Sequence, residues 1–163
     1  MLSEDPLRYV LFPIRAERLP IWHAYKKHLA CFWTPEEIDY AADKAEWDAL
    51  SPDERFFLEH ILAFFAGSDG IVLENLIDNF GSEIQWAEVR CFYGFQAMIE
   101  NVHSEVYSLL IDEYIDDDAR KKELFEAIEH IPCIQRKARW AKRWMDRGSQ
   151  PFARRLVAFA IVE

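Results

Sequence analysis

The sequence predicts an all-α protein, built as a bundle of long helices with short connections. Half of its 163 residues (51%) are hydrophobic, which is enough for a buried core, and only 5 are glycine, which disfavours a turn-rich all-β domain. Apolar residues recur at steps of three and four along stretches that contain no proline, the pattern of a buried helix face. The length suits one compact domain.

The chain is expected to begin with an extended arm, residues 1–20. Pro6, Pro13 and Pro20 interrupt this stretch and disfavour a helix. The arm carries an apolar segment, residues 9–12, which we expect to lie over the surface of the protein. Residues 21–163 are expected to form the helical bundle.

Two helix starts share one pattern. Thr34 and Ser51 are each followed by a proline and, three residues after the cap, by a glutamate. The hydroxyl can accept a hydrogen bond from a free backbone N–H while the glutamate reaches back to the cap. We therefore expect helices to begin after Thr34 and after Ser51. The second should be one long helix over residues 52–80, because no proline interrupts its apolar periodicity.

The remaining helices are bounded by residues that end helices. Gly81 and Ser82 are expected to end the long helix, and Ser82 with Gln85 to start the next one, which runs to about Tyr114. Pro132 and Gly148 separate the last elements. These are expected helices over residues 119–130, 133–146 and 152–163.

Charge and composition limit the possible functions. Nineteen basic and 29 acidic residues give a net charge of −10, which disfavours a nucleic-acid partner. The basic stretch 136–147 is interpreted as a solvated helix face, because Trp140 and Trp144 lie at core spacing between the charges. No uncharged run approaches the about 20 residues of a membrane span, and charges at residues 4–8 interrupt any signal peptide. We expect a cytoplasmic protein that binds neither nucleic acid nor membrane.

The 3 cysteines are odd in number and have no metal-binding spacing. Cys31, Cys91 and Cys133 are therefore expected to be reduced and buried, with neither a disulfide framework nor a zinc site.

One histidine has the spacing of a metal ligand. Of the 5 histidines, only His103 follows a carboxylate, Glu100, by three residues. Residues i and i+3 share a helix face, so both side chains can bind one metal ion. The apolar segment 91–99 precedes them, so Glu100 would be buried, and a buried carboxylate needs a partner.

Two further acids, Asp69 and Glu163, also fall within apolar runs on other predicted helices. Together with Glu100 and His103 they are candidates for one metal site. The alternative is that they are separate acids on helix faces next to hydrophobic runs, and the residues alone leave both interpretations open. Tyr107 lies on the same helix face as Glu100 and His103. It is either an ordinary core tyrosine or, beside a metal that handles dioxygen, an oxidisable group.

Longer motifs carry a resemblance to a known family. Residues 63–72 (AFFAGSDGIV), 90–96 (RCFYGFQ) and 100–112 (ENVHSEVYSLLID) resemble the radical-generating small subunit of class I ribonucleotide reductase, in its eukaryotic and viral form. The likeness extends through residues 9–14 and 30–34 to residues 157–163, and so covers nearly the whole chain.

The resemblance implies a ferritin-like helical bundle with two iron ions in an Fe–O–Fe centre. Asp69, Glu100 and His103 would ligate the first iron, and Glu100 would also bridge to the second. Glu163 would ligate the second iron. Carboxylate oxygens and imidazole suit iron through its redox change.

The resemblance also implies a radical function. The di-iron centre would activate dioxygen, and Tyr107 would be oxidised to a stored tyrosyl radical. Trp33 would pass the radical toward the large catalytic subunit, which reduces ribonucleotides to deoxyribonucleotides. Relatives are homodimers, so a homodimer is expected.

The sequence departs from the family in length. Small subunits are much longer, and their second ExxH pair, the apolar lining of the radical pocket and the tail that docks on the large subunit would lie beyond Glu163. The chain is thus expected to hold about the N-terminal half of the bundle, as a partial sequence or a truncated form.

Two other classes remain as alternatives. Another di-iron oxidase or a ferroxidase would not need Tyr107 or Trp33 at these positions. A metal-free helical scaffold would tolerate the loss of Asp69 or His103.

Overall fold

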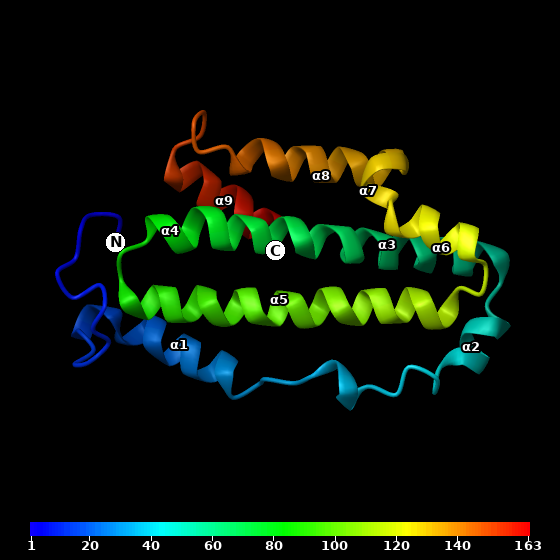
Figure 1. The fold of residues 1–163 in the computed structure, drawn as a ribbon, viewed down its shortest axis with the longest axis horizontal. Helices are drawn as coiled ribbons and strands as arrows, with labels where there is room; N and C mark the ends of the chain where they lie inside the picture. Colours follow the sequence, from blue (N-terminus) through cyan, green and yellow to red (C-terminus); the bar gives the residue numbers. More distant parts are fainter.

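Two long antiparallel helices form the centre of the protein (Figure 1). The computed structural model describes residues 1–163. Helix α3 (Pro52–Glu74) continues through a π-helical segment, η3 (Asn75–Phe80), into the short helix α4 (Gly81–Glu83). After a turn, α5 (Ala87–Tyr114) returns alongside α3. The predicted capping box starts α3: the Ser51 hydroxyl accepts from the N–H of Glu54, and the Glu54 carboxylate accepts from the N–H of Ser51.

The other elements cover the outer sides of this pair (Figure 1). Helix α1 (Leu19–Leu29), preceded by the turn η1 (Ala16–Arg18), packs on α5. The chain then runs along α5, through the single turn η2 (Pro35–Glu37), to α2 (Lys44–Ala49). On the α3 side lie α6 (Asp118–Phe125), α7 (Ala127–His130), α8 (Pro132–Met145) and α9 (Phe152–Val162). The structure has helices and no strands, so the predicted all-α bundle is confirmed.

The helix predicted after Thr34 is wrong. The capping box forms, but it caps only η2, and the backbone is already extended at Ile38. A short helix depends on packing of an apolar face, and the residues from Glu36 to Asp39 are exposed. A cap without a buried face therefore gives a single turn.

The predicted boundary at Gly81 and Ser82 is also wrong, by several residues. Gly81 keeps a right-handed helical backbone, and the Ser82 hydroxyl donates to the carbonyl of Asp78 instead of capping a new helix. Helix α5 therefore begins at Ala87. The helix predicted over 119–130 is divided into α6 and α7, because Glu126 leaves the helical conformation.

The surface agrees only partly with expectation. The predicted solvated face of α8 is present: Arg136, Lys137, Arg139, Lys142 and Arg143 are exposed. The expected core position of Trp140 is wrong, because this residue is exposed as well. All 3 cysteines are free, but Cys31 and Cys133 are exposed, so their predicted burial is wrong. The reason is that both lie beside helix ends, where fewer side chains cover them.

The continuous helix Pro52–Glu83 is long and apolar enough to cross a membrane, judged by length and composition. The expectation from the sequence rested on uncharged runs, none of which approaches about 20 residues, whereas this criterion allows up to 2 charged residues in its window. Core helices of soluble proteins meet it as well, and this helix buries the polar residues Asp69, Asn75 and Asn79. A membrane-spanning helix would place such groups in lipid at a high cost.

The core has three apolar clusters: a small one joins α3 to α8 (Ile71, Ala138 and Ala141), and the two larger ones lie toward the two ends of the α3–α5 pair. The first of the larger clusters surrounds Phe80 and contains Val72, Leu76, Ile84, Val89 and Phe159. The second surrounds Ile111 and contains Trp47, Ala63, Ile115, Leu124, Ala127, Ile131 and Ile134. The stretch of α3 and α5 between them carries the polar residues Asp69 and Glu100.

An ion-pair cluster attaches the start of the chain to α5. Arg18 lies 2.5 Å from Asp5 and 3.2 Å from Glu88, and its guanidinium covers the ring of Trp86 at 4.4 Å. All three charged side chains are almost fully buried, and buried charges are stable only when paired. The first helical element begins only at Ala16, and α1 takes Pro20 into its first turn. The division into an arm of residues 1–20 and a bundle stays a prediction.

We expect Phe80→Ala to lower the free energy of unfolding by about 3–5 kcal/mol, the usual cost of a large cavity in a core. Phe80 is fully buried, and its ring lies between those of Tyr93, Phe152 and Phe159, at 5.1–5.7 Å between centroids. Urea unfolding followed by circular dichroism measures the change. Phe57, which is 62% exposed, is the control, and Phe57→Ala should change stability by less than about 1 kcal/mol. Equal losses in the two variants would contradict this description of the core.

Candidate metal centre

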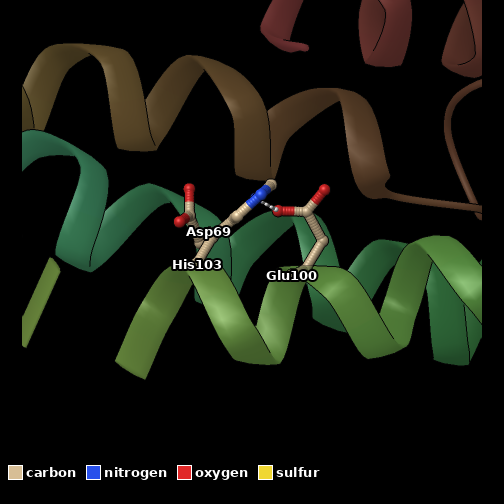
Figure 2. Close-up of side chains that lie close together, drawn as sticks. All are labelled: Asp69, Glu100 and His103. Carbon is tan, nitrogen blue, oxygen red and sulfur yellow. Dashed lines mark hydrogen bonds and ion pairs between the residues drawn. The ribbon is translucent and has the colours of Figure 1, made fainter. Parts of the chain in front are cut away.

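Asp69 from α3 meets Glu100 and His103 from α5 between the two larger apolar clusters (Figure 2). One oxygen or nitrogen atom from each side chain lies within 4.8 Å of the others. Glu100 and His103 are neighbours on one face of α5, with Nδ1 of His103 3.3 Å from Oε2 of Glu100. Two helices thus direct two carboxylates and an imidazole to one point.

The two carboxylates of the cluster are buried and incompletely satisfied, whereas the side chain of His103 is 37% exposed. Asp69 is 8% exposed and Glu100 is 7% exposed. Oδ2 of Asp69 is buried without a hydrogen-bond partner, and Oδ1 has only a long contact of 3.5 Å with the hydroxyl of Ser68. A buried carboxylate oxygen without a partner is costly, so Asp69 lacks an interaction that a bound cation would supply.

The pKa values of both carboxyls are shifted in the direction that burial produces. Burial, and after it the charge of Glu100, raises the pKa of Asp69 to about 6. Burial also raises the pKa of Glu100. Both groups therefore carry their negative charge at a cost, and a divalent cation between them would reverse that cost.

Glu163 lies near the cluster but outside it. It lines a cavity of about 590 Å³ together with Glu100 and His103. Its Oε1 accepts a hydrogen bond of 2.8 Å from Nε2 of Gln96. Burial of the carboxyl, and after it the charge of Glu100, raises the pKa of Glu163 to about 7, although the residue as a whole is exposed at the end of the chain. The structure therefore brings three of the four predicted ligands together and leaves Glu163 at the wall of the adjoining cavity.

Tyr107 follows His103 by one turn of α5, and its ring stacks on that of Phe65 from α3 (4.9 Å between centroids, 14° between planes). Burial raises the pKa of its phenol, and the charges of Asp69 and Glu100 contribute in that order. The phenol is thus close enough to the cluster for the charges of both carboxylates to raise its pKa.

Trp33 lies in the irregular segment between α1 and η2, and its ring centroid is 6.0 Å from that of His103. The segment that follows α1 thereby brings an indole to the histidine of the cluster, although the two residues are far apart in the sequence. The roles of Trp33 and Tyr107, like those of the four ligands, stay predictions.

Two contacts at the site were not expected from the sequence. Gln96 precedes Glu100 by four residues, so the helical period that linked Glu100 to His103 also places Gln96 on that face. Phe65 precedes Asp69 by four residues on α3. The same spacing rule could have indicated both residues, but not which side chains they contact on other helices.

The donor set fits a first-row transition metal. Carboxylate oxygen and imidazole nitrogen together suit iron or manganese, and a site with few protein ligands keeps positions open for other molecules. Such an ion would bind Oδ2 of Asp69, the buried oxygen that has no hydrogen-bond partner in this structure.

Comparison with known proteins gives a consistent result. A family model described as "Ribonucleotide reductase, small chain" matches residues 8–163. The chain is 56% identical to the ribonucleoside-diphosphate reductase small chain of Nicotiana tabacum, over all of this chain and 49% of that protein. It is 55% identical to subunit M2 of Rattus norvegicus, over all of this chain and 41% of that protein.

A solved structure agrees in fold. The ribonucleotide reductase Rnr4 homodimer from Saccharomyces cerevisiae superposes with a TM-score of 0.83 at 40% identity, over 98% of this chain and 50% of that one. The ferritin-like helical fold is thereby confirmed. The chain spans about half the length of the relatives it matches. Because the match includes nearly every residue of this sequence, the chain belongs to the ribonucleotide reductase small-chain family.

Proposed function

We propose that this chain is part of the small subunit of a ribonucleoside-diphosphate reductase, in which it binds iron and stores a tyrosyl radical on Tyr107. The observation that carries the proposal is the convergence of Asp69, Glu100 and His103 within 4.8 Å, with Tyr107 one turn further along α5. The names of the relatives support the reaction, the reduction of ribonucleotides to deoxyribonucleotides.

Asp69, Glu100 and His103 would hold the first iron ion, and Glu100 would also reach the second. Glu163 would serve the second ion from the wall of the adjoining cavity. The rest of that ligand set is expected from an ExxH pair outside this sequence. When bound, the two iron ions supply the activation of dioxygen and a one-electron oxidation.

The side chains around the site prepare Tyr107 for that oxidation. The apolar clusters on either side limit the access of water from the two ends of the helix pair, and water would otherwise quench the radical. Oxidation of a phenol to a neutral radical removes one electron and the phenolic proton.

Trp33 would connect the site to the large subunit. It belongs to a segment outside the two central helices, and its ring contacts that of His103. An electron can therefore pass between the surface of the bundle and the metal cluster through two neighbouring rings. This contact favours a radical-transferring subunit over another di-iron oxidase or a ferroxidase.

The proposed partners are the large catalytic subunit and a second copy of the small subunit. The solved Rnr4 relative is a homodimer, which supports the second proposal. We propose a cytoplasmic location, with no nucleic acid or membrane as partner.

Asp69→Asn and His103→Gln should each weaken iron binding by at least about tenfold. Loss of a residue that only hydrogen-bonds to a metal ligand already lowers metal affinity by about that factor, and loss of a ligand should cost more. Each change removes a charged or strongly donating atom from the cluster. Metal content after equilibrium dialysis against ferrous iron without oxygen measures the effect. Glu105→Gln, an exposed carboxylate on the same helix, is the matched control and should leave binding unchanged. Unchanged binding in Asp69→Asn would contradict the ligand assignment.

Tyr107→Phe in the intact protein should leave iron loading and oxygen consumption in place and remove the tyrosyl radical signal. Phenylalanine keeps the ring and its packing and removes only the oxidisable hydroxyl. Electron paramagnetic resonance after addition of iron and oxygen is the measurement. The assignment is wrong if this variant keeps both the radical signal and reductase activity.

Trp33→Phe should separate radical formation from turnover. Tyr107 keeps its surroundings, so the radical signal should form, whereas reduction of ribonucleotides with the large subunit should be lost because the path through the indole is interrupted. Trp140→Phe, on the outer face of α8, is the control and should keep both. Normal turnover in Trp33→Phe would exclude Trp33 from the path.

A further inference from the structure

The Tyr107 side chain is oriented by packing. Its ring pairs with one other aromatic ring, that of Phe65, in a nearly parallel stack. Its hydroxyl makes no hydrogen bond to another residue of the chain. Phe65 is therefore the aromatic residue of this chain that packs against the Tyr107 ring.

The stack belongs to the same helix contact as the metal cluster. Helices α3 and α5 are antiparallel, so the residue one turn before Asp69 and the residue one turn after His103 lie at the same level. These residues are Phe65 and Tyr107. The backbone spacing that brings Asp69 to His103 also brings the two rings together.

The neighbours of Phe65 have other contacts. Phe64 lies under the Nζ of Lys137 from α8, at 4.3 Å. Phe57, two turns earlier on α3, is 62% exposed and pairs with no aromatic ring. Of these phenylalanines, only Phe65 faces Tyr107.

We propose that Phe65 is a positioning residue for Tyr107, whose ring fixes the rotation of the tyrosine side chain and shields one face of the phenol. The consequence for the radical rests on the proposed function, because it requires that Tyr107 be oxidised. The unpaired electron of a phenoxyl radical is spread over the ring, and its coupling to the Cβ protons depends on the rotation of the ring. A fixed rotation gives one well-defined coupling, and a covered face limits contact with reductants.

The first measurement is independent of the metal and of the radical. The three-bond couplings between the Hα and the two Hβ protons of isotope-labelled Tyr107 report the rotation of the side chain about Cα–Cβ. They should be unequal in the unchanged protein, because one staggered rotamer is populated. The rotation of the ring about Cβ–Cγ is measured by the Cβ-proton splitting of the radical, described below. Tyr107→Phe identifies which of the signals from the 6 tyrosines belongs to Tyr107. Phe65→Leu should average the two couplings and leave those of the other tyrosines unchanged.

Two further variants keep the test decisive. Phe65→Met retains an apolar side chain of similar volume without a ring plane, so it should also average the couplings. Phe65→Tyr restores a ring and should recover the unequal couplings. Phe57→Leu is the matched control on the same helix and should have no effect. Circular dichroism shows that each variant keeps its helices.

The second measurement follows the radical in the intact, iron-loaded protein. Phe65→Leu and Phe65→Met should form the tyrosyl signal with a changed or broadened Cβ-proton splitting and a shorter lifetime, while iron content stays the same. If the unchanged protein forms no tyrosyl radical, the proposed function fails, and the couplings still decide the role of Phe65. If Phe65→Leu and Phe65→Met keep unequal couplings and an unchanged splitting, the positioning role of Phe65 is overturned.

Discussion

The antiparallel contact between α3 and α5 buries two carboxylates, Asp69 and Glu100, between apolar clusters at either end of the helix pair. Burial makes each negative charge costly and raises the pKa of both carboxyls, and one oxygen of Asp69 has no partner at all. Apolar residues pack on both sides of these charges. Burying the two carboxylates therefore costs free energy that a bound cation would offset. For this reason a metal site explains their position better than two unrelated acids on neighbouring helix faces do.

Two surrounding elements bring further side chains to the cluster of Asp69, Glu100 and His103. The segment after α1 brings Trp33 to His103, and α9 ends with Glu163 at the cavity beside Glu100. Trp33 comes from an irregular segment and Glu163 from the end of α9, whereas Asp69, Glu100 and His103 lie on the two long helices, which hold side chains more closely than loops do. The stack of Phe65 on Tyr107 uses the same α3–α5 register as the metal cluster. The proposed ligands and the proposed radical therefore lie at one contact between the same two helices.

Local sequence signals predicted the long helices and the pairing of Glu100 with His103, because both depend on the helical period within one segment. The same signals misplaced the element after Thr34, since a capping box cannot show whether the next residues have a face to bury. Contacts between distant segments, such as Trp33 with His103, depend on the path of the irregular chain and have no local signal. Resemblance to the family, and not spacing, supplied the roles of Trp33, Tyr107 and Glu163.

The central claim is that Asp69, Glu100 and His103 bind one iron ion. Crystals of the protein soaked with ferrous iron without oxygen, and measured on both sides of the iron absorption edge, test it most directly. We expect an anomalous difference peak for one iron ion, within bonding distance of a carboxylate oxygen of Asp69, a carboxylate oxygen of Glu100 and a ring nitrogen of His103. A peak bonded to other residues, or no peak at this position in crystals that contain iron elsewhere, would contradict it.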